Sequence, residues 1–395
     1  MPQAFRSLAL LAVATLVGGC QTLFGVGSDV YSPSYLERPL WTTAQLDSPE
    51  GVLEYLVAYP DEFSLVAYWT DAPERGLHHN PDVPRPLAST IKLLVLAEYA
   101  RQVEAGQLDP EERVPLDSIG VYHVPLTDGG AHRQALAWLG TGRVRDGAVA
   151  LDDVARVMIR HSSNAATDYL ITRLGRAAVL QSPSRTGADA SDAPLPFSGV
   201  FGGANARGVA VAPDEAFARA ARYRSDPGYR RWNRVAQVLN PIRLSYVEQR
   251  RNSHSLPAGT AADYAGLVAR AYQGALVSDS VSAHVAGVLN WPMGYGWSQE
   301  RFEAYGLKGG SVAGVLTRVA YARPRADARG PAGGTAPGSG IALALLVQNL
   351  PRHVFETWYY GQAFADFTTR MLTDPDFFER VRTAIAVAAP PEGPR

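Results

Sequence analysis

The segment 86–106 constrains the fold more than any other part of the chain. Its apolar residues at positions 93, 96, 97, 100 and 103 follow helical spacing, and two further apolar side chains widen the buried face. A helix with so wide an apolar face has to be covered by neighbouring elements on most sides. The same segment places Ser89 in the first turn and Lys92 shortly after it, and Gly106 is a plausible stop. The sequence therefore predicts a largely buried helix that carries a lysine close to its start.

Lysine occurs at two positions, Lys92 and Lys308, whereas thirty-five of the 37 basic residues are arginines. Arginine supplies charge and bidentate hydrogen bonds, but it does not give up its proton in proteins. A lysine does so once burial or a neighbouring cation lowers its pKa. We interpret the two lysines as positions that need a compact amine able to lose its proton.

Ser89 and Lys92 are three residues apart, so a helix places both side chains on one face. The amine could then take the hydroxyl proton. The first-turn N–H groups, which lack partners within the helix, would face a developing oxyanion. In the alternative interpretation, Ser89 only caps the helix and Lys92 extends its amine towards water. This pair alone leaves both interpretations open.

Two further segments place a serine beside other reactive or small residues. Helical spacing before and after Ser162-Ser163-Asn164 predicts two helices, with these three residues as the loop between them. The same residues would also serve as an ordinary helix N-cap. Segment 306–321 predicts one β-strand, and its small residues near Lys308 let another group approach the backbone closely.

In chain order, these segments carry Ser-x-x-Lys, Ser-x-Asn and Lys-x-Gly. The ordered set resembles the motifs of the penicillin-binding protein and serine β-lactamase superfamily, and the chain is most similar to its class A-like branch. Residues 259–268 and 309–315 resemble the helix and strand around the third motif there, and the resemblance covers about residues 46–386. It implies an α/β (α+β) fold of the β-lactamase/transpeptidase type. In that fold, helices flank an antiparallel sheet and a second subdomain is all helical.

The resemblance implies a catalytic role for four residues. Ser89 is the nucleophile that forms an acyl-enzyme, and Lys92 is the general base that activates it. Ser162 passes a proton to the leaving group, with electrostatic help from Lys308. Such a site needs these residue types, because a serine alcohol is a weak nucleophile unless a base of lowered pKa lies beside it.

The resemblance also implies three substrate-binding positions, Asn164, Gly310 and Ser311. Asn164 would hydrogen-bond the amide side chain of the substrate, and the backbone N–H groups of Ser89 and Ser311 would form the oxyanion hole. One departure concerns Gly309, where the family usually has Thr or Ser. The hydroxyl expected to bind a substrate carboxylate is therefore missing, and Ser311 replaces it only if the geometry differs.

Another departure concerns the glutamate with which class A β-lactamases deacylate. Glu248 and Asn252 have the offset of that glutamate and its asparagine, but the usual leucine is missing. The alternative is a solvated polar stretch. If Glu248 is not the base, we expect slow acyl-enzyme turnover on β-lactams and behaviour closer to a peptidase or esterase. Ser163 in place of the usual Asp, and an insertion expected within 176–245, also separate the chain from class A enzymes.

The N-terminus predicts export. Arg6 precedes an apolar run over 8–17, and Cys20, the only cysteine in the chain, follows two glycines. This pattern resembles a bacterial lipoprotein processing site, at which Cys20 would be lipidated. Gln21 is consistent with outer-membrane sorting if the cell is Gram-negative. The alternative is a simple signal peptide cleaved nearby. We predict a lipoprotein of the cell envelope that faces the periplasm and is held at the membrane by its lipid.

The predicted organisation is a signal peptide over 1–19, a tether over 20–45 and a catalytic domain over 46–386. Within the catalytic domain, a helical subdomain is expected at about 88–275 and a sheet subdomain at about 46–75 and 285–386. The site is expected between these subdomains.

Local patterns predict the main elements of the sheet subdomain. Residues 52–59 predict a helix, and 63–69 predict a strand. Residues 308–321 and 341–349 predict two adjacent antiparallel strands, separated by an insertion rich in Pro, Gly and Ala over 323–340. Residues 355–372 predict one amphipathic helix that packs on the sheet.

Composition and motifs argue against several other classes of protein. The net charge is −1 and the arginines are interspersed with acids, so no basic stripe suggests nucleic acid. The interior of the chain has no apolar stretch of about 18 residues and no His-Glu-x-x-His, phosphate loop or Gly-x-Ser-x-Gly motif. The eight histidines are scattered, so neither a metal nor a cofactor is expected. Tyr122 and Trp138 could line a cleft, but burial in the core is the commoner role of such residues.

We therefore predict a monomeric serine hydrolase that forms an acyl-enzyme. The expected substrates are β-lactams or acyl-D-alanyl peptides like those of peptidoglycan. One alternative is an esterase or a D,D-carboxypeptidase-like enzyme with the same Ser89 and Lys92. Another is a non-catalytic envelope lipoprotein that keeps the fold as a binding module.

Overall fold

The computed structural model describes residues 41–388, with the exception of 202–209, 244 and 326–338. Cys20, the predicted signal peptide over 1–19 and nearly all of the predicted tether lie outside the described residues. The structure therefore does not test the predicted signal peptide, lipidation site and tether.

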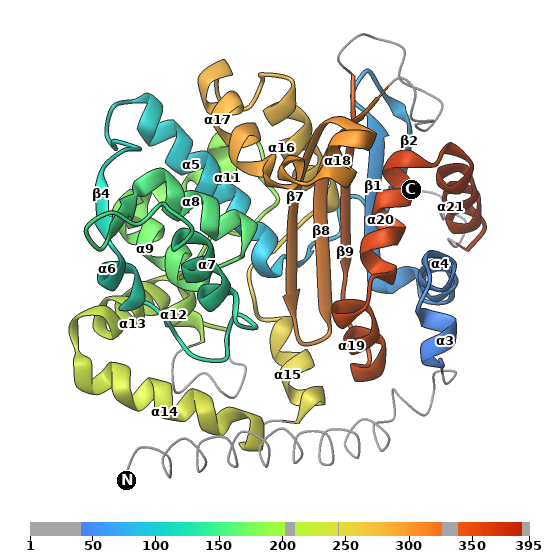
Figure 1. The fold of residues 1–395 in the computed structure, drawn as a ribbon. Helices are drawn as coiled ribbons and strands as arrows, with labels where there is room; N and C mark the ends of the chain where they lie inside the picture. Colours follow the sequence, from blue (N-terminus) through green and yellow to red (C-terminus); the bar gives the residue numbers. More distant parts are fainter. Residues whose placement is uncertain (1–40, 202–209, 244, 326–338, 389–395) are drawn as a thin grey trace.

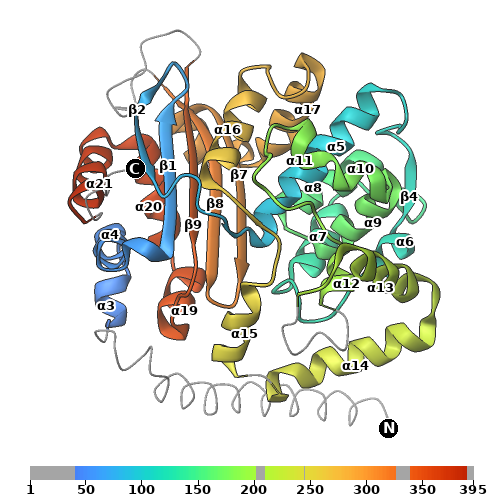
Figure 2. The ribbon, with the colours of Figure 1, turned by 180° about the vertical axis from the view of Figure 1, so that it is seen from behind.

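A five-stranded sheet forms one half of the fold (Figures 1 and 2). Neighbouring strands pair antiparallel in the order β2-β1-β9-β8-β7. The central strand β9 is fully buried, as its unbroken apolar run requires. The predicted α/β fold with an antiparallel sheet is confirmed. The strands are β1 (Phe63–Trp69), β2 (Ala72–His79), β7 (Phe302–Val312), β8 (Val315–Pro324) and β9 (Ile341–Val347).

The prediction of one strand over 308–321 is wrong, because the segment is a hairpin. β7 and β8 pair directly up to Val312 and Val315, and the chain turns at Ala313 and Gly314. Gly314 has φ +75°, a left-handed conformation that glycine adopts without strain. The continuous apolar character on both sides of the turn concealed it. The predicted antiparallel neighbours are β8 and β9.

Four helices cover one face of the sheet: α4 (Pro49–Ala58), α19 (Arg352–Tyr360), α20 (Ala363–Thr373) and α21 (Pro375–Ala388) (Figures 1 and 2). The single helix predicted over 355–372 is therefore wrong. The chain breaks at Gly361, where a Cβ would lie 2.5 Å from the carbonyl oxygen of Thr357. Helical spacing continues across this break, which is why the pattern suggested one helix.

The helical half packs on the other face of the sheet. At its centre is α5 (Lys92–Glu104), which follows the 3-10 turn η2 (Ala88–Ile91) and is buried over most of its length. The buried helix predicted for this segment is thus present. Around it lie α8 (Leu151–Arg160), α9 (Asn164–Leu174), α16 (Ala261–Tyr272) and α17 (Asp279–Leu289), and α16 also packs against β8 and β9. The boundaries proposed for the two subdomains stay a prediction.

Shorter elements complete the chain between these helices and strands. The two small ladders join β3 (Arg85–Pro86) to β6 (Ala258–Gly259) and β4 (Arg113–Pro115) to β5 (Ala148–Ala150). The remaining helices are α3 (Thr43–Leu46), η1 (Pro60–Glu62), α6 (Leu116–Gly120), α7 (Ala131–Leu139), α10 (Arg176–Leu180), α11 (Ser182–Arg185), α12 (Phe197–Val200), α13 (Pro213–Ser225), α14 (Pro227–Arg243), α15 (Tyr246–Ser253), η4 (Trp291–Gly294) and α18 (Gly296–Arg301).

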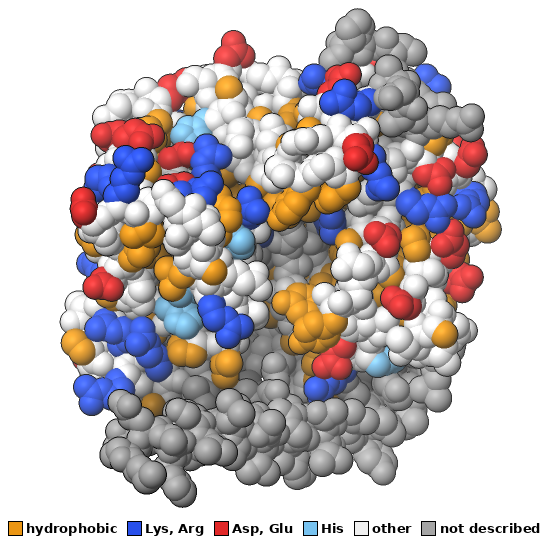
Figure 3. Space-filling view, in the orientation of Figure 1, with side chains coloured by type: hydrophobic (Ala, Val, Ile, Leu, Met, Phe, Trp, Pro, Cys, Tyr) orange, Lys and Arg blue, Asp and Glu red, His pale blue; other side chains and the backbone are white. Residues whose placement is uncertain are grey.

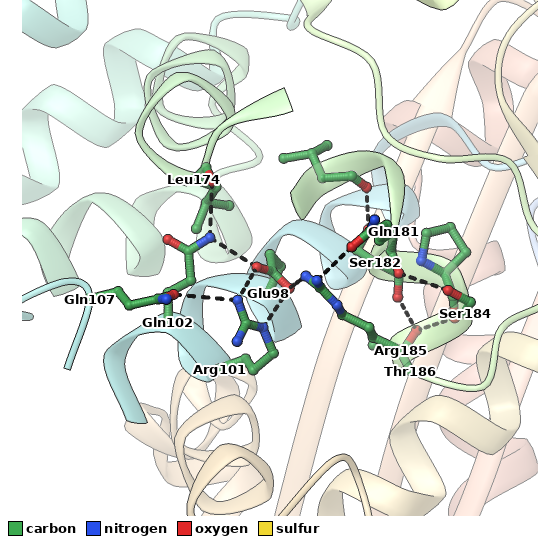
Figure 4. Close-up of polar contacts among 12 residues, drawn as sticks. Glu98, Arg101, Gln102, Gln107, Leu174, Gln181, Ser182, Ser184, Arg185 and Thr186 are labelled. Atoms are coloured by element: carbon green, nitrogen blue, oxygen red, sulfur yellow. Dashed lines mark hydrogen bonds and ion pairs between the residues drawn. The ribbon is translucent and has the colours of Figure 1, made fainter. Parts of the chain in front are cut away.

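A buried carboxylate fixes α5 to its neighbours (Figure 4). Glu98 accepts hydrogen bonds from Arg101, at 2.8 and 2.9 Å, from Gln102 at 2.9 Å and from Arg185 of α11 at 3.0 Å. Burial raises the pKa of Glu98, but these hydrogen bonds outweigh burial and hold it below its usual value. The carboxylate therefore stays charged and ties α11 to the helix that carries Lys92.

Candidate active site

The turn that carries Ser89 lies directly against strand β7. Thr317 of β8 donates a hydrogen bond of 3.1 Å to the carbonyl oxygen of Leu87, which fixes the turn on the sheet. A Cβ at Gly310 would lie 2.6 Å from the backbone nitrogen of Ser89. Since L-residues do not tolerate such a contact, only glycine lets β7 approach this closely. The predicted binding position Gly310 is therefore a spacer at the nucleophile.

Lys92 lies at the centre of a polar cluster. Its Nζ is 2.8 Å from Ser89 Oγ, 2.7 Å from Asn164 Oδ1 and 2.8 Å from the carbonyl oxygen of Ser162. The side chain is fully buried. Burial, reinforced by the charge of Lys308, lowers the pKa of Lys92 well below its usual value. An amine in this environment can exist uncharged beside the serine hydroxyl.

Ser162 joins the two lysines. Its Oγ is 3.2 Å from Lys92 Nζ and accepts a hydrogen bond of 3.0 Å from Lys308 Nζ. Ser162 has φ +65°, an uncommon conformation for a non-glycine residue, at the turn between α8 and α9. Burial lowers the pKa of Lys308 to about 7. The four residues predicted as catalytic therefore meet at one place.

The remaining residues of the Ser-Ser-Asn loop are fixed by their neighbours. Asn164 donates a hydrogen bond of 3.1 Å to the carbonyl oxygen of Thr127. Ser163 caps α9 by accepting from the backbone N–H of Ala166 at 3.2 Å, and its Oγ lies 3.1 Å from Nδ1 of the buried His132. The loop thus caps α9 and also forms a wall of the site. The sequence had left both roles open for these residues.

A cavity of about 980 Å³ opens over these groups, between the helical half and the sheet. Figure 3 shows the hollow in the middle of the molecular face. The cavity is lined by several predicted site residues: Ser89, Ser162, Asn164, Gly310 and Ser311. Lys92 and Lys308 lie beneath this lining and contact it through Ser89 and Ser162.

Arg318 also lines the cavity, and sequence reasoning missed it. On β8 it lies directly opposite Gly309, which contributes no side chain, and one of its terminal nitrogens is 3.5 Å from the Tyr305 hydroxyl. Arg318 Nε is buried and has no hydrogen-bond partner among the described residues. A buried donor of this kind suits an anion. No local motif marks Arg318, because its position depends on the register of the β7–β8 hairpin.

A sequence model of the Beta-lactamase enzyme family matches residues 51–292, which is more than half of the chain. The chain belongs to this family. The superfamily resemblance drawn from the three motifs is thereby confirmed. The match ends before Lys308, which the structure brings to the other motifs.

Several solved structures are similar to the chain at low identity. A β-lactamase from Sphaerobacter thermophilus DSM 20745 is 19% identical, with a TM-score of 0.49, over 80% of this chain and 94% of that one. A β-lactamase from Desulfarculus baarsii DSM 2075 is 18% identical, with a TM-score of 0.45, over 88% and 98%. A structure of PBP-A is 18% identical, with a TM-score of 0.44, over 83% and 98%. No curated protein matches the chain.

Glu248, which the sequence suggested as a deacylation base, lies at the start of a helix. Glu248 is exposed and caps α15, where its carboxylate accepts bonds of 2.8 Å from the N–H and the hydroxyl of Ser245. These bonds lower the pKa of Glu248. Among the described residues, Asn252 lines the cavity and Glu248 does not. The solvated alternative fits Glu248 better than the role of a base.

An aromatic ring covers the cluster on the side of α12. The ring centroid of Phe197 is 4.5 Å from Lys92 Nζ. Asp168 holds this turn by accepting bonds from the backbone N–H groups of Phe197, at 2.6 Å, and Ser198, at 2.7 Å. Burial raises the pKa of Asp168 to about 6, although these bonds oppose the rise. The immediate surroundings of Lys92 are therefore partly apolar.

Two further observations concern metals and membranes. Within the described ranges, no group of three or more His, Cys, Asp or Glu side chains is arranged to hold a metal ion. No helix in the same ranges is both long and apolar enough to cross a bilayer.

Proposed function

We propose that the protein is a serine hydrolase that forms an acyl-enzyme on Ser89. The supporting observation is the separation of 2.8 Å between Ser89 Oγ and Lys92 Nζ, in a site where burial favours the uncharged amine. The Ser89 oxygen bonds to the carbonyl carbon of the substrate, and its proton passes to Lys92. The carbonyl oxygen receives hydrogen bonds from the backbone N–H groups of Ser89 and Ser311.

The leaving group departs on the side of Ser162. Ser162 gives its hydroxyl proton to the leaving nitrogen or oxygen as the bond to the carbonyl carbon breaks. The proton on Lys92 then replaces the one that Ser162 has lost. Lys308, 3.0 Å from Ser162 Oγ, stabilises the negative charge that develops there. Water later cleaves the ester, releasing the acid and restoring the hydroxyl of Ser89.

The proposed substrates are β-lactams or acyl-D-alanyl amides and esters. Asn164 would bind the substrate amide. Arg318, with its buried free Nε, would bind a substrate carboxylate in place of the hydroxyl that Gly309 lacks. A guanidinium pairs with a carboxylate through two parallel hydrogen bonds, so Arg318 would favour anionic substrates.

The surroundings of Lys92 favour slow deacylation on β-lactams. Glu248 is occupied as a helix cap, and the apolar ring of Phe197, 4.5 Å from Lys92 Nζ, offers no acceptor for a deacylating water on that side. This supports the alternative of a D,D-carboxypeptidase-like enzyme or esterase, for which β-lactams act as slowly released acylating agents.

The decisive experiment is intact-protein mass spectrometry after incubation with benzylpenicillin. We expect a mass increase equal to one penicillin, persisting for minutes and absent in Ser89→Ala. Rapid loss of the adduct, with steady turnover of a chromogenic cephalosporin, would establish a β-lactamase instead. Absence of any adduct with penicillins, cephalosporins and activated esters would favour the non-catalytic binding lipoprotein.

We further propose that the mature protein is a lipoprotein of the cell envelope, modified at Cys20. The support is the sequence pattern of Arg6, the apolar run over 8–17 and the lone cysteine. Metabolic labelling with an alkyne fatty acid should mark the wild type and not Cys20→Ser. Unlabelled wild-type protein would leave the simple signal peptide as the explanation.

A further inference from the structure

Arg160 stands at the end of α8 among three aromatic rings. Its guanidinium carbon is 5.2 Å from the ring centroid of Trp138, 5.8 Å from that of Trp291 and 5.6 Å from that of Tyr295. It donates a hydrogen bond of 3.1 Å to the Tyr295 hydroxyl. Rings at such distances orient a guanidinium while leaving most of its N–H donors available.

Arg160, Trp138 and Trp291 line a pocket of about 350 Å³, and the Tyr295 hydroxyl bonds to Arg160 beside it. Two other arginines on its wall have carboxylate partners, since Arg156 pairs with Asp152 at 2.8 Å and Arg143 with Asp153 at 3.5 Å. In the part of the chain that the structure describes, no ion pair joins Arg160 to a carboxylate. The pocket therefore contains a guanidinium without a carboxylate partner among the described residues, next to Trp291 and to Trp138, whose ring also carries Arg143 at 3.7 Å.

The pocket adjoins the candidate active site. Trp291 donates a hydrogen bond of 2.9 Å to the carbonyl oxygen of Leu307, the residue before Lys308. His161 lines the main cavity, and its ring centroid lies 6.0 Å from that of Trp138. Its Nε2 is buried and has no hydrogen-bond partner within the described ranges. Arg160 in the pocket and His161 in the main cavity are consecutive residues, so the two hollows are neighbours close to Ser162.

We propose that this pocket is a second binding subsite, which takes a flat anionic group on the leaving-group side of the substrate. The inference rests on the proposed function, because Ser162 defines the leaving-group side. Arg160 would pair with the anion, a carboxylate in the simplest case. Trp138 and Trp291, which line the pocket, would contact the flat part that carries it, and Tyr295 would hold Arg160 in place. Arg318 serves a different group, since it extends from β8 into the main cavity.

The subsite predicts discrimination between leaving groups that differ only in charge. A carboxylate gains the charged hydrogen bonds of Arg160, whereas a carboxamide of the same shape does not. A charged hydrogen bond of this kind corresponds to a factor of about ten or more in kcat/KM.

The test uses two hippuryl thioesters with the same acyl group. One releases 3-mercaptobenzoate and the other releases 3-mercaptobenzamide. We expect the wild type to prefer the anionic thioester about tenfold or more in kcat/KM, and Arg160→Gln to reduce the ratio to near one. The neutral thioester should react at a similar rate in both proteins, which also reports correct folding. Arg156→Gln, with the same charge change in the same pocket, should keep the preference.

The outcomes separate this subsite from the chemistry at Ser89. Equal hydrolysis of both thioesters by the wild type, or a preference that survives in Arg160→Gln, overturns the subsite while acyl transfer stands. No hydrolysis above that of Ser89→Ala overturns the proposed function and the subsite with it. If Arg160→Gln does not fold, Arg160→Met replaces it, and a preference undiminished in that uncharged variant also overturns the subsite.

Discussion

At the scale of single residues, the hydroxyl of Ser162 lies between two amines. Lys92 and Lys308 are 3.2 and 3.0 Å from it in a buried site. Two ammonium ions would repel each other strongly there, because little water screens them. Charge on Lys308 therefore favours the neutral form of Lys92, which is the form that the proposed base requires.

Replacing Lys92 by arginine tests this requirement. Lys92→Arg keeps a positive charge but cannot lose its proton, so we expect acylation by benzylpenicillin about a hundredfold slower or worse, close to Lys92→Ala. The rate of adduct formation, followed by mass spectrometry, measures the effect. Near-normal acylation by Lys92→Arg would mean that Lys92 contributes charge alone.

The pH dependence of acylation follows from Lys308. Burial lowers its pKa to about 7, so it is charged below that pH and becomes neutral as the pH rises through it. We expect the acylation rate to fall on the alkaline side of about pH 7. Lys308→Arg, which stays charged, should lose this alkaline limb. An unchanged limb in that variant would assign the limb to another group.

At the scale of elements, the contact between β7 and the turn η2 sets the geometry of the site. In Gly310→Ala, the new methyl would lie 2.6 Å from the Ser89 nitrogen, so strand and turn must separate. Displacing one oxyanion donor costs roughly 3 kcal/mol, which is about a hundredfold in acylation rate. Stopped-flow acylation measures this cost.

Gly309→Ala is the matched control for that variant. The nearest atom to its Cβ would be the carbonyl oxygen of Thr317, at an ordinary contact distance of 3.8 Å. Acylation by Gly309→Ala should stay within a few fold of wild type. An equal loss in both variants would mean that the strand tolerates no side chain at all and that the Gly310 contact is not special.

The Glu98 network predicts a stability effect with a definite pH dependence. Glu98→Ala leaves Arg101 and Arg185 without their buried carboxylate, which should cost about 3 kcal/mol of unfolding free energy at neutral pH. The pKa of Glu98 is lowered on folding, so its contribution is full above about 4.5 and is lost as the pH falls through the folded value. The difference between wild type and variant in urea unfolding should therefore shrink on acidification.

Glu379→Ala provides the control for the stability prediction. Glu379 forms an exposed i,i+3 pair with Arg382, and pairs of this kind contribute little. Its unfolding midpoint should match that of wild type at both neutral and acid pH. A loss as large as that in Glu98→Ala would show that the assay responds to any change of charge.

The sequence predicted the ends of helices and strands where the polarity of the residues changes. It did not predict ends that are set by the backbone conformation of one residue. The helix that starts at Lys92 has a strong apolar face, and the strand over 63–69 is bounded by turn residues, so both were found. The turn at Gly314 and the break at Gly361 interrupt apolar runs without a change in composition. Each depends on a single glycine and on the contacts around it, which periodicity does not report.

At the scale of the whole molecule, the site is assembled from three segments far apart in the chain. The order of the motifs predicted that Ser89, Ser162 and Lys308 would meet, because a known family arranges them so. It did not predict Arg318 or Arg160, whose positions depend on strand register and on packing between α8 and η4. It suggested Glu248 through its offset from Asn252, but Glu248 also stands three residues after Ser245, which is the spacing of a capping box.

The burial of both lysines has a practical consequence for handling the protein. Lys92 is 0% exposed and Lys308 is 2% exposed. Amine-directed labels should therefore leave both side chains of the native protein untouched, and endoproteinase Lys-C should cleave it only after unfolding. The rate of digestion by that protease therefore reports how often the native protein unfolds.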